Sequence, residues 1–304
     1  MKILLLGKNG QVGQALERAL APLAGPGKLL ALDRSNGGDL SQLQDLAQTI
    51  RQLQPQVIVN AAAYTAVDKA ESEPDQARLI NALAPEVLAK EAQALGAWLV
   101  HYSTDYVFDG SGTRPWLETD ATAPLNVYGQ TKLAGERLIQ AHCTRHLILR
   151  TSWVYAAQGS NFVKTMLKLA QERERLTVID DQWGAPTGAE LLADVTTTAI
   201  SQICQAGNDA LAGLYHLAAG GETTWHQYAS DVIGRAQALR PDLPWAVQDI
   251  VPVPSSAFVT AARRPHNSRL NTAKLQAALG IHLPDWQQGV DDMLAQVLIS
   301  TPPK

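Results

Sequence analysis

The sequence predicts an α/β protein in which a doubly wound parallel β-sheet is followed by a smaller C-terminal α/β lobe. Short apolar runs at 3–6, 29–32, 57–59 and 98–102 alternate with segments of helical periodicity, a pattern typical of a parallel sheet covered by helices. The first run passes directly into a glycine-rich turn and then a helix. After residue 151 the alternation weakens. We therefore predict a first domain over 1–151, to whose sheet later strands can return, and a second lobe over 152–304.

Composition narrows the class of protein and its partners. The chain has 304 residues, of which 46% are hydrophobic and 18% charged, and its net charge of -4 is spread without a block of one sign. No nucleic-acid or membrane surface is indicated. The apolar run 1–6 stops at Gly7, too short for a signal peptide, and Cys143 and Cys204 match no metal or redox spacing. We expect a cytoplasmic protein and assign no metal-binding residue.

The first strand leads into Gly7-x-x-Gly10-x-x-Gly13 and a helix beginning near Gln14. Glycines at these places allow a tight turn and a close approach of the backbone to a pyrophosphate, and the helix N-terminus offers unpaired N–H groups. The second run ends in Asp33, twenty residues beyond Gly13, where a Rossmann unit places its ribose-binding acid. Arg34 follows and could instead face the 2′-phosphate of NADP, so the pair leaves the choice of dinucleotide open.

The third and fourth predicted strands are each followed by residues that could border a bound ligand. Helices are expected over about 41–53 and 74–95, the second ended by Gly96. Between them, small residues at 60–65 leave the third strand and would let a ligand lie close to the backbone, although packing alone explains them equally well. Residues 103–105, Ser-Thr-Asp, follow the fourth strand. Because open α/β sheets bind ligands at the carboxyl ends of their strands, the hydroxyl of Thr104 can reach such a crevice. By itself, a Ser-Thr-Asp run is more often a turn or a cap.

Tyr128 and Lys132 stand four residues apart in a segment of helical character, so their side chains share one face. A neighbouring ammonium favours the phenolate and is expected to lower the pKa of Tyr128 from its usual value of about 10. Such a tyrosine can give a proton to a reacting oxygen. The same spacing also occurs on ordinary amphipathic surface helices, so the pair alone does not establish catalysis.

The later chain is expected to hold a strand over 146–151, a loop over 184–188, and a helix over 190–204. The second lobe is expected to include the run 213–217, a helix over 224–239, the proline-rich 251–254 and a last helix over 284–298. Arg263, Arg264 and Arg269 form a basic cluster. Basic loop residues are usually solvated, but three arginines this close could equally hold a phosphorylated substrate.

These segments together resemble the extended short-chain dehydrogenases across nearly the whole chain, and within them a branch that reduces 4-keto sugar nucleotides. The resemblance rests on the shared order of the glycine loop, Thr104, the Tyr128-x-x-x-Lys132 pair and five longer runs at 60–68, 102–108, 124–129, 150–155 and 262–270. One turn, at 24–27, is slightly longer than is usual in the family. It lengthens only a predicted surface loop.

The resemblance implies a role for each matching residue. The catalytic set would be Tyr128, Lys132 and Thr104, and the sugar nucleotide would lie against Thr104, Asp105, Tyr128 and Trp153. The residues implied around the dinucleotide are Gly7, Gly10, Gln11, Val12, Gly13, Asp33, Asp39, Leu40, Ala63, Tyr64, Thr65, Tyr102 and Lys132. The cofactor would be NADPH or NADH, the partner a small-molecule nucleotide sugar, and the assembly a homodimer, with Mg²⁺ left open.

The activity implied is reduction of the 4-keto group of dTDP-4-dehydro-L-rhamnose to dTDP-L-rhamnose by hydride from NAD(P)H, with Tyr128 protonating the oxygen. Sugar-nucleotide dehydratases and epimerases share the scaffold. The dehydratases carry an acidic pair after the threonine, whereas Asp105 is followed here by Tyr106. A non-catalytic regulatory subunit of the methionine adenosyltransferase type is the alternative from another class, and retention of Thr104, Tyr128 and Lys132 favours an enzyme.

Overall fold

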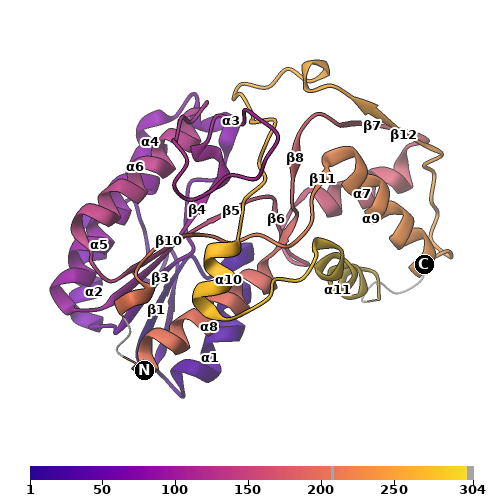
Figure 1. Cartoon of the computed structure of the whole chain (residues 1–304). Helices are drawn as coiled ribbons and strands as arrows, with labels where there is room; N and C mark the ends of the chain where they lie inside the picture. Colours follow the sequence, from indigo (N-terminus) through magenta and orange to yellow (C-terminus); the bar gives the residue numbers. More distant parts are fainter. Residues whose placement is uncertain (207–208, 300–304) are drawn as a thin grey trace.

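The computed structural model describes residues 1–206 and 209–299 and shows two lobes side by side (Figure 1). The larger lobe is built on a six-stranded parallel sheet with the order β10-β5-β4-β3-β1-β2. Its strands are β1 (Ile3–Leu6), β2 (Leu29–Leu32), β3 (Val57–Asn60), β4 (Trp98–Thr104), β5 (His146–Thr151) and β10 (Gly213–His216). The predicted fold class is confirmed.

Helices cover both faces of this sheet, which explains why its strands are continuous apolar runs. In β1, Ile3 and Leu5 pack on one face and Leu4 and Leu6 on the other, because successive side chains of a strand point to opposite sides. The first face carries α1 (Gln11–Ala24), α8 (Ala189–Ala206) and α10 (Ala273–Leu279). The second carries α2 (Leu43–Leu53), α5 (Ala84–Leu95) and α6 (Val127–His142).

The segment 74–95, predicted as one helix, is helical throughout but contains a π-helical turn. It runs as α4 (Pro74–Arg78), η1 (Leu79–Leu83) and α5. Asn81 lies in the π turn, where its Oδ1 accepts from the backbone N of Tyr64 at 2.8 Å and its Nδ2 donates to the Tyr64 carbonyl at 3.1 Å. The short helix α3 (Val67–Ala70) precedes it. The π turn thus fixes the segment that leaves β3, and π turns frequently occur near functional sites.

The smaller lobe has its own core, formed around Tyr228, Val232, Val290 and Met293. Its helices are α7 (Phe162–Glu172), α9 (Trp225–Leu239) and α11 (Trp286–Ile299), and its parallel pair is β7 (Arg175–Ile179) with β12 (Asp249–Val253). Two short strand pairs are β6 (Val154–Tyr155) with β9 (Thr187–Gly188) and β8 (Trp183–Gly184) with β11 (Thr223–Thr224).

Short 3₁₀ turns occur along the whole described chain. They are η2 (Asp105–Val107) after β4, η3 (Asp209–Leu211) before β10 and η4 (Ser255–Ala257) after β12.

Two expectations about the later chain are corrected. The run 213–217, placed in the second lobe from sequence, forms β10 beside β5 in the large sheet, with Leu214 opposite Ile148. A strand of only four residues does not show in its sequence which sheet it will join. The expected loop 184–188 also includes the end of β8 and the whole of β9. The domain division at residue 151 stays a prediction. The last residues of the predicted second lobe, 300–304, lie outside the described ranges.

Within the described residues, no helix is both long enough and apolar enough to cross a bilayer.

Candidate active site

The glycine loop has the close contacts that its sequence predicts. Gly7 has a φ of +85°, a left-handed value that glycine adopts without strain. A Cβ at Gly13 would lie 2.0 Å from the carbonyl oxygen of Gly7, and one at Gly7 would lie 2.7 Å from the backbone N of Ala62. Any side chain at these places would push the loop away from α1 and β3. Gly10 and Gln11, at the N-terminus of α1, line a cavity.

A cavity of about 370 Å³ lies beside the loop and is lined by Asp33, Arg34 and Leu40 among others. The carboxylate of Asp33 accepts hydrogen bonds from Ser35 Oγ at 2.6 Å, Ser35 N at 2.8 Å and Asn9 Nδ2 at 2.9 Å. These bonds, led by those from Ser35, hold the pKa of Asp33 at about 2. Asp33 is thus a fixed carboxylate at the end of β2, and the exposed Arg34 borders the same cavity.

A second cavity, of about 730 Å³, continues from the first across the carboxyl ends of the central strands and shares Gly7, Gly10 and Ala63 with it. Most of the site residues predicted from the sequence line this second cavity: Gly7, Gly10, Gln11, Val12, Ala63, Thr65, Tyr102, Thr104, Asp105, Tyr128, Lys132 and Trp153. Residues from the start of the chain and from beyond residue 151 thus meet at one site.

Three predicted cofactor residues do not line either cavity. Gly13 packs against the loop backbone. Asp39 accepts hydrogen bonds from Ser41 N and Oγ at 2.9 and 2.8 Å. The hydroxyl of Tyr64 donates to Glu73 at 2.7 Å. The roles of these three residues stay predictions.

Tyr128 enters the cavity from the first turn of α6. Asn126 caps this helix by accepting from Gly129 N at 2.8 Å. Burial raises the pKa of Tyr128 to about 12, while a hydrogen bond with Thr104 acts in the opposite direction. The expected lowering by Lys132 is therefore wrong for this geometry, because loss of solvent outweighs the stabilising contacts. The phenol stays protonated at neutral pH, which is the form a proton donor needs.

Lys132 lies one turn further along α6 and is almost fully buried. Its ammonium donates to the carbonyl oxygen of Tyr102 at 2.5 Å, and Nζ lies 3.2 Å from Nε2 of His101. Burial lowers the pKa of Lys132 to about 8, with Glu136 acting against the change. Lys132 also lines the second cavity.

Asp105 follows Thr104 at the end of β4 and is buried. Its Oδ1 accepts from Thr104 Oγ1 at 3.2 Å, whereas Oδ2 has no hydrogen-bond partner among the described residues. Burial raises the pKa of this carboxyl to about 7, and hydrogen bonds from Ser268 and Thr104 oppose that rise. Because the group borders the cavity, it can either donate or accept a hydrogen bond there near neutral pH.

Trp153 forms the wall nearest the smaller lobe. Its backbone has a φ of +48°, a left-handed value that is uncommon outside glycine. The indole stacks on Trp225 with ring centroids 3.7 Å apart and 15° between the planes. A Cβ at Gly184 would lie 2.7 Å from Cε2 of Trp153. Sequence reasoning missed Trp225, because nothing in the periodicity of α9 shows which of its residues reaches the cavity.

The basic cluster is largely occupied by partners within the chain. Arg264 donates to Asp68 at 2.6 Å, and Arg269 donates to Asn267 at 2.8 Å and to Glu222 at 3.2 Å. Of the two alternatives left open by the sequence, these contacts favour a structural role for Arg264 and Arg269. They hold the segment that returns from β12 to the larger lobe (Figure 1).

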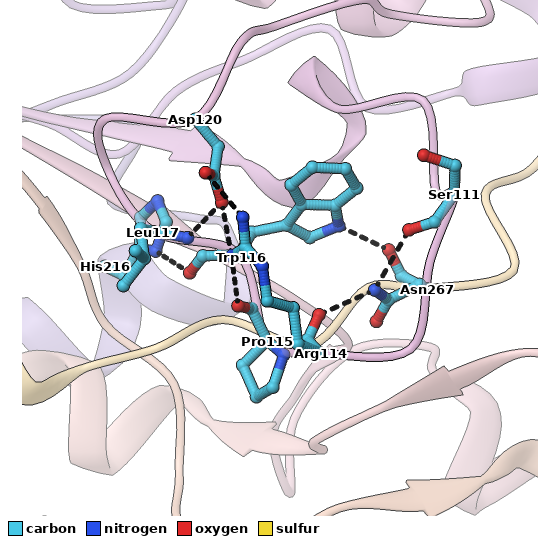
Figure 2. A network of polar contacts seen from close by, with 8 residues as sticks. All are labelled: Ser111, Arg114, Pro115, Trp116, Leu117, Asp120, His216 and Asn267. Carbon is cyan, nitrogen blue, oxygen red and sulfur yellow. Dashed lines mark hydrogen bonds and ion pairs between the residues drawn. The ribbon is translucent and has the colours of Figure 1, made fainter.

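The same segment is fastened to the loop after β4, as Figure 2 shows. Asn267 Nδ2 donates to the carbonyl oxygens of Arg114 at 2.8 Å and Ser111 at 3.3 Å, and Trp116 Nε1 donates to the Asn267 carbonyl at 3.0 Å. His216 of β10 lies 3.1 Å from the carbonyl of Trp116. The loop is therefore tied to both the large sheet and the later chain.

Among residues 1–206 and 209–299, no group of three or more His, Cys, Asp or Glu side chains is placed to hold a metal ion. The open alternative of Mg²⁺ thus has no support from the described side chains.

A glycine loop at a helix N-terminus, a fixed carboxylate after the second strand, and a threonine, tyrosine and lysine around one continuous cavity define a dinucleotide-dependent oxidoreductase of the short-chain type. Comparison with known proteins specifies the family. The family model described as RmlD substrate binding domain matches residues 1–299, and the chain belongs to this family.

Relatives agree along the whole chain. A dTDP-4-dehydrorhamnose reductase of Shigella flexneri is 59% identical over 304 residues, which cover 99% of each protein. The solved structure of a dTDP-4-dehydrorhamnose reductase from Clostridium acetobutylicum matches with a TM-score of 0.88 at 32% identity, over 99% of this chain and 100% of that one. That of the Bacillus anthracis enzyme in complex with NADP gives 0.86 at 33% identity, with the same coverage.

Proposed function

We propose that the chain reduces the 4-keto group of dTDP-4-dehydro-L-rhamnose to dTDP-L-rhamnose with NADPH or NADH, and that Tyr128 donates the proton. The observation that carries this proposal is the convergence of Thr104, Tyr128 and Lys132 on the cavity that continues from the glycine loop. The names of full-length relatives, and the NADP bound to one of them, support the same substrate and cofactor.

The described residues fit a nicotinamide dinucleotide. The N-terminus of α1, whose first backbone N–H groups have no side-chain cap, would receive the pyrophosphate, and the Asp33 carboxylate would accept from a ribose hydroxyl. Lys132 and Tyr102 line the wall where the nicotinamide end would lie. The bound cofactor would supply the hydride.

The roles of the chain's own residues follow from their surroundings. Tyr128, held protonated by burial, gives its proton to the keto oxygen as negative charge develops there. Thr104 hydrogen-bonds the same oxygen and stabilises that charge. Lys132 stabilises the phenolate that remains, because a cation favours the charged form of a neighbouring acid.

The dehydratase alternative needs a group that this chain lacks at the corresponding place. A dehydratase of this scaffold would require a second acid after Thr104, but Tyr106 stands beyond Asp105 and lies edge-on to the ring of Tyr128, with centroids 5.8 Å apart. A purely regulatory subunit would not require Thr104, Tyr128 and Lys132 around one cavity. Co-purification with a methionine adenosyltransferase would favour that alternative.

The decisive assay measures oxidation of NADPH and NADH with a panel of nucleotide 4-keto sugars. We expect turnover with the dTDP-4-keto-6-deoxy sugar and none when the keto sugar is omitted. Absence of turnover with this substrate and both cofactors would refute the proposed activity.

Both nicotinamides are expected to work. The Asp33 carboxylate favours a free ribose 2′-hydroxyl, while the guanidinium of Arg34 on the same cavity tolerates a 2′-phosphate. Replacement of Arg34 by alanine should lower kcat/KM for NADPH about tenfold and leave that for NADH nearly unchanged, the loss expected for one charged hydrogen bond. A wild-type preference above about a thousandfold, near 4 kcal/mol, would rule out dual use.

Trp153→Phe is expected to raise the KM for the sugar nucleotide several-fold while KM for NADPH and the melting temperature stay almost unchanged. The indole borders the cavity, where it can lie against an apolar sugar face and donate one hydrogen bond that phenylalanine cannot. A large fall in melting temperature with an unaltered KM would make Trp153 a packing residue.

A homodimer in the cytoplasm remains the expected assembly and location. Light scattering on the purified protein measures the first.

A further inference from the structure

A hydrogen bond between the two lobes lies beside the glycine loop. Figure 1 shows α7 in the smaller lobe and α1 in the larger one. Asn161 is the N-cap residue of α7, and Gln11 is the first residue of α1. Asn161 Nδ2 donates to Gln11 Oε1 at 3.0 Å, although the two residues are 150 positions apart in the sequence. Asn161 has no part in the proposed reaction.

The orientation of the Asn161 amide is fixed by two backbone groups. Its Oδ1 accepts from Lys164 N at 3.1 Å, which caps α7. Its Nδ2 donates to the carbonyl oxygen of Ala156 at 2.6 Å. A backbone N–H can only donate and a carbonyl oxygen can only accept, so the two ends of this amide cannot be exchanged. Asn161 therefore offers a donor, and not an acceptor, to Gln11.

The orientation of the Gln11 amide follows from that of Asn161. Because Asn161 presents an N–H, Gln11 turns Oε1 towards it and leaves Nε2 for other partners. Within the part of the chain that the structure describes, Nε2 of Gln11 has no hydrogen-bond partner. Gln11 lines the second cavity together with Gly7 and Gly10. The two hydrogens of Nε2 thus remain available to a ligand at the glycine loop.

An amide nitrogen at this place suits an anionic ligand. The glycine loop and the N-terminus of α1 are where the pyrophosphate of the proposed dinucleotide would lie. Nε2 of Gln11 can donate to a phosphate oxygen. If the amide were reversed, Oε1 would face the phosphate, and two acceptors would meet without a hydrogen between them. Asn161 selects the first of these orientations.

We propose that Asn161 is a positioning residue that orients the Gln11 amide, so that Nε2 hydrogen-bonds the pyrophosphate of the bound dinucleotide. The inference rests on the proposed function, because it takes the ligand of the glycine loop to be a nicotinamide dinucleotide. Asn161 itself lines neither of the two cavities. The smaller lobe thereby contributes to cofactor binding through a hydrogen bond to the larger one.

Two single variants measure the contribution of each amide. Gln11→Ala removes the amide that would bind phosphate, and its Kd for NADPH should rise about tenfold, the loss expected for one hydrogen bond to a charged group. Asn161→Ser keeps a side-chain oxygen that caps α7 but removes the donor to Gln11. Its Kd should rise about three- to tenfold, because Gln11 then loses its fixed orientation. Isothermal titration calorimetry measures these constants.

The double variant separates positioning from a merely structural role. If Asn161 acts through Gln11, adding Asn161→Ser to Gln11→Ala should change the Kd by less than about twofold, since the residue to be oriented is already absent. A residue that only caps α7 would raise the Kd by the same factor in both backgrounds. Equal factors in the two backgrounds, or an unchanged Kd in Asn161→Ser alone, would overturn the proposal.

The choice of cofactor provides a second readout. NADPH and NADH share the pyrophosphate, so Asn161→Ser should raise the Kd of both by the same factor. Arg34→Ala, in contrast, is expected to affect NADPH alone. A loss in Asn161→Ser that is confined to one of the two cofactors would contradict a contact with the pyrophosphate.

Asn271→Ser is the matched control. The Oδ1 of Asn271 accepts from Ala273 N at 3.0 Å at the start of α10, and Asn271 lines neither cavity. This variant should leave the Kd for NADPH unchanged. Melting temperatures show that each variant is folded, and Asn161→Thr, which can also cap a helix, replaces Asn161→Ser if the serine variant does not fold.

The binding experiment needs no keto sugar, so its outcome is separate from the proposed reaction. A non-additive pair of variants beside absent turnover would reject the proposed reduction and keep this inference. Normal turnover beside additive variants would do the reverse. A wild-type protein that binds neither NADPH nor NADH would overturn both.

Discussion

Tyr128→Phe is expected to lower kcat by about a hundredfold or more, because loss of a positioned general acid typically costs 10²–10⁴-fold. A hundredfold corresponds to about 2.7 kcal/mol of transition-state stabilisation. The KM for the sugar nucleotide should change little, since the ring remains and only the hydroxyl that bonds Thr104 is removed. Steady-state kinetics with NADPH and the keto sugar measure both quantities.

Tyr228→Phe is the matched control for this experiment. Tyr228 is also buried, lies in the core of the smaller lobe, and has a hydroxyl with no hydrogen-bond partner among the described residues. Its loss should leave kcat near the wild-type value. Near-normal turnover in Tyr128→Phe would assign proton donation to another group of the cavity, of which Asp105 is the first candidate.

Arg150→Met is expected to destabilise the fold by about 3–5 kcal/mol, because it leaves a buried charge without its partner. Arg150 Nε and Nη2 donate to Glu136 at 2.8 and 2.6 Å, and the two side chains are only 4% and 2% exposed. The pair joins β5 to α6, one helical turn beyond Lys132. Urea denaturation followed by circular dichroism measures the loss as a lower midpoint.

The double variant Glu136→Leu with Arg150→Met should recover most of that stability, since replacing both members of a buried pair by apolar residues is often nearly neutral. Lys168→Ala, which breaks an exposed pair with Glu172 at 3.9 Å, should cost less than about 0.5 kcal/mol. If the double variant were as unstable as Arg150→Met, an effect other than the unpaired carboxylate of Glu136 would be responsible.

The family, the fold class and most cavity residues could be read from the sequence because they depend on local patterns. Apolar runs that are buried on both sides define strands, the glycine spacing defines the turn before α1, and the i, i+4 spacing places Tyr128 and Lys132 on one face of α6. The end of a parallel strand also fixes where Thr104 and Asp105 must emerge.

Contacts between distant segments were decided only by the tertiary structure. The tertiary structure decides which sheet receives β10, which residue of α9 stacks on Trp153, and which carboxylates bind the arginines at 264 and 269. Each depends on packing between segments far apart in the sequence, which no short pattern encodes. The same limit explains the wrong direction expected for the pKa of Tyr128. Spacing shows that a lysine is near, but only the folded chain shows that burial raises the pKa of Tyr128 and that Lys132 Nζ donates to the Tyr102 carbonyl and lies beside His101.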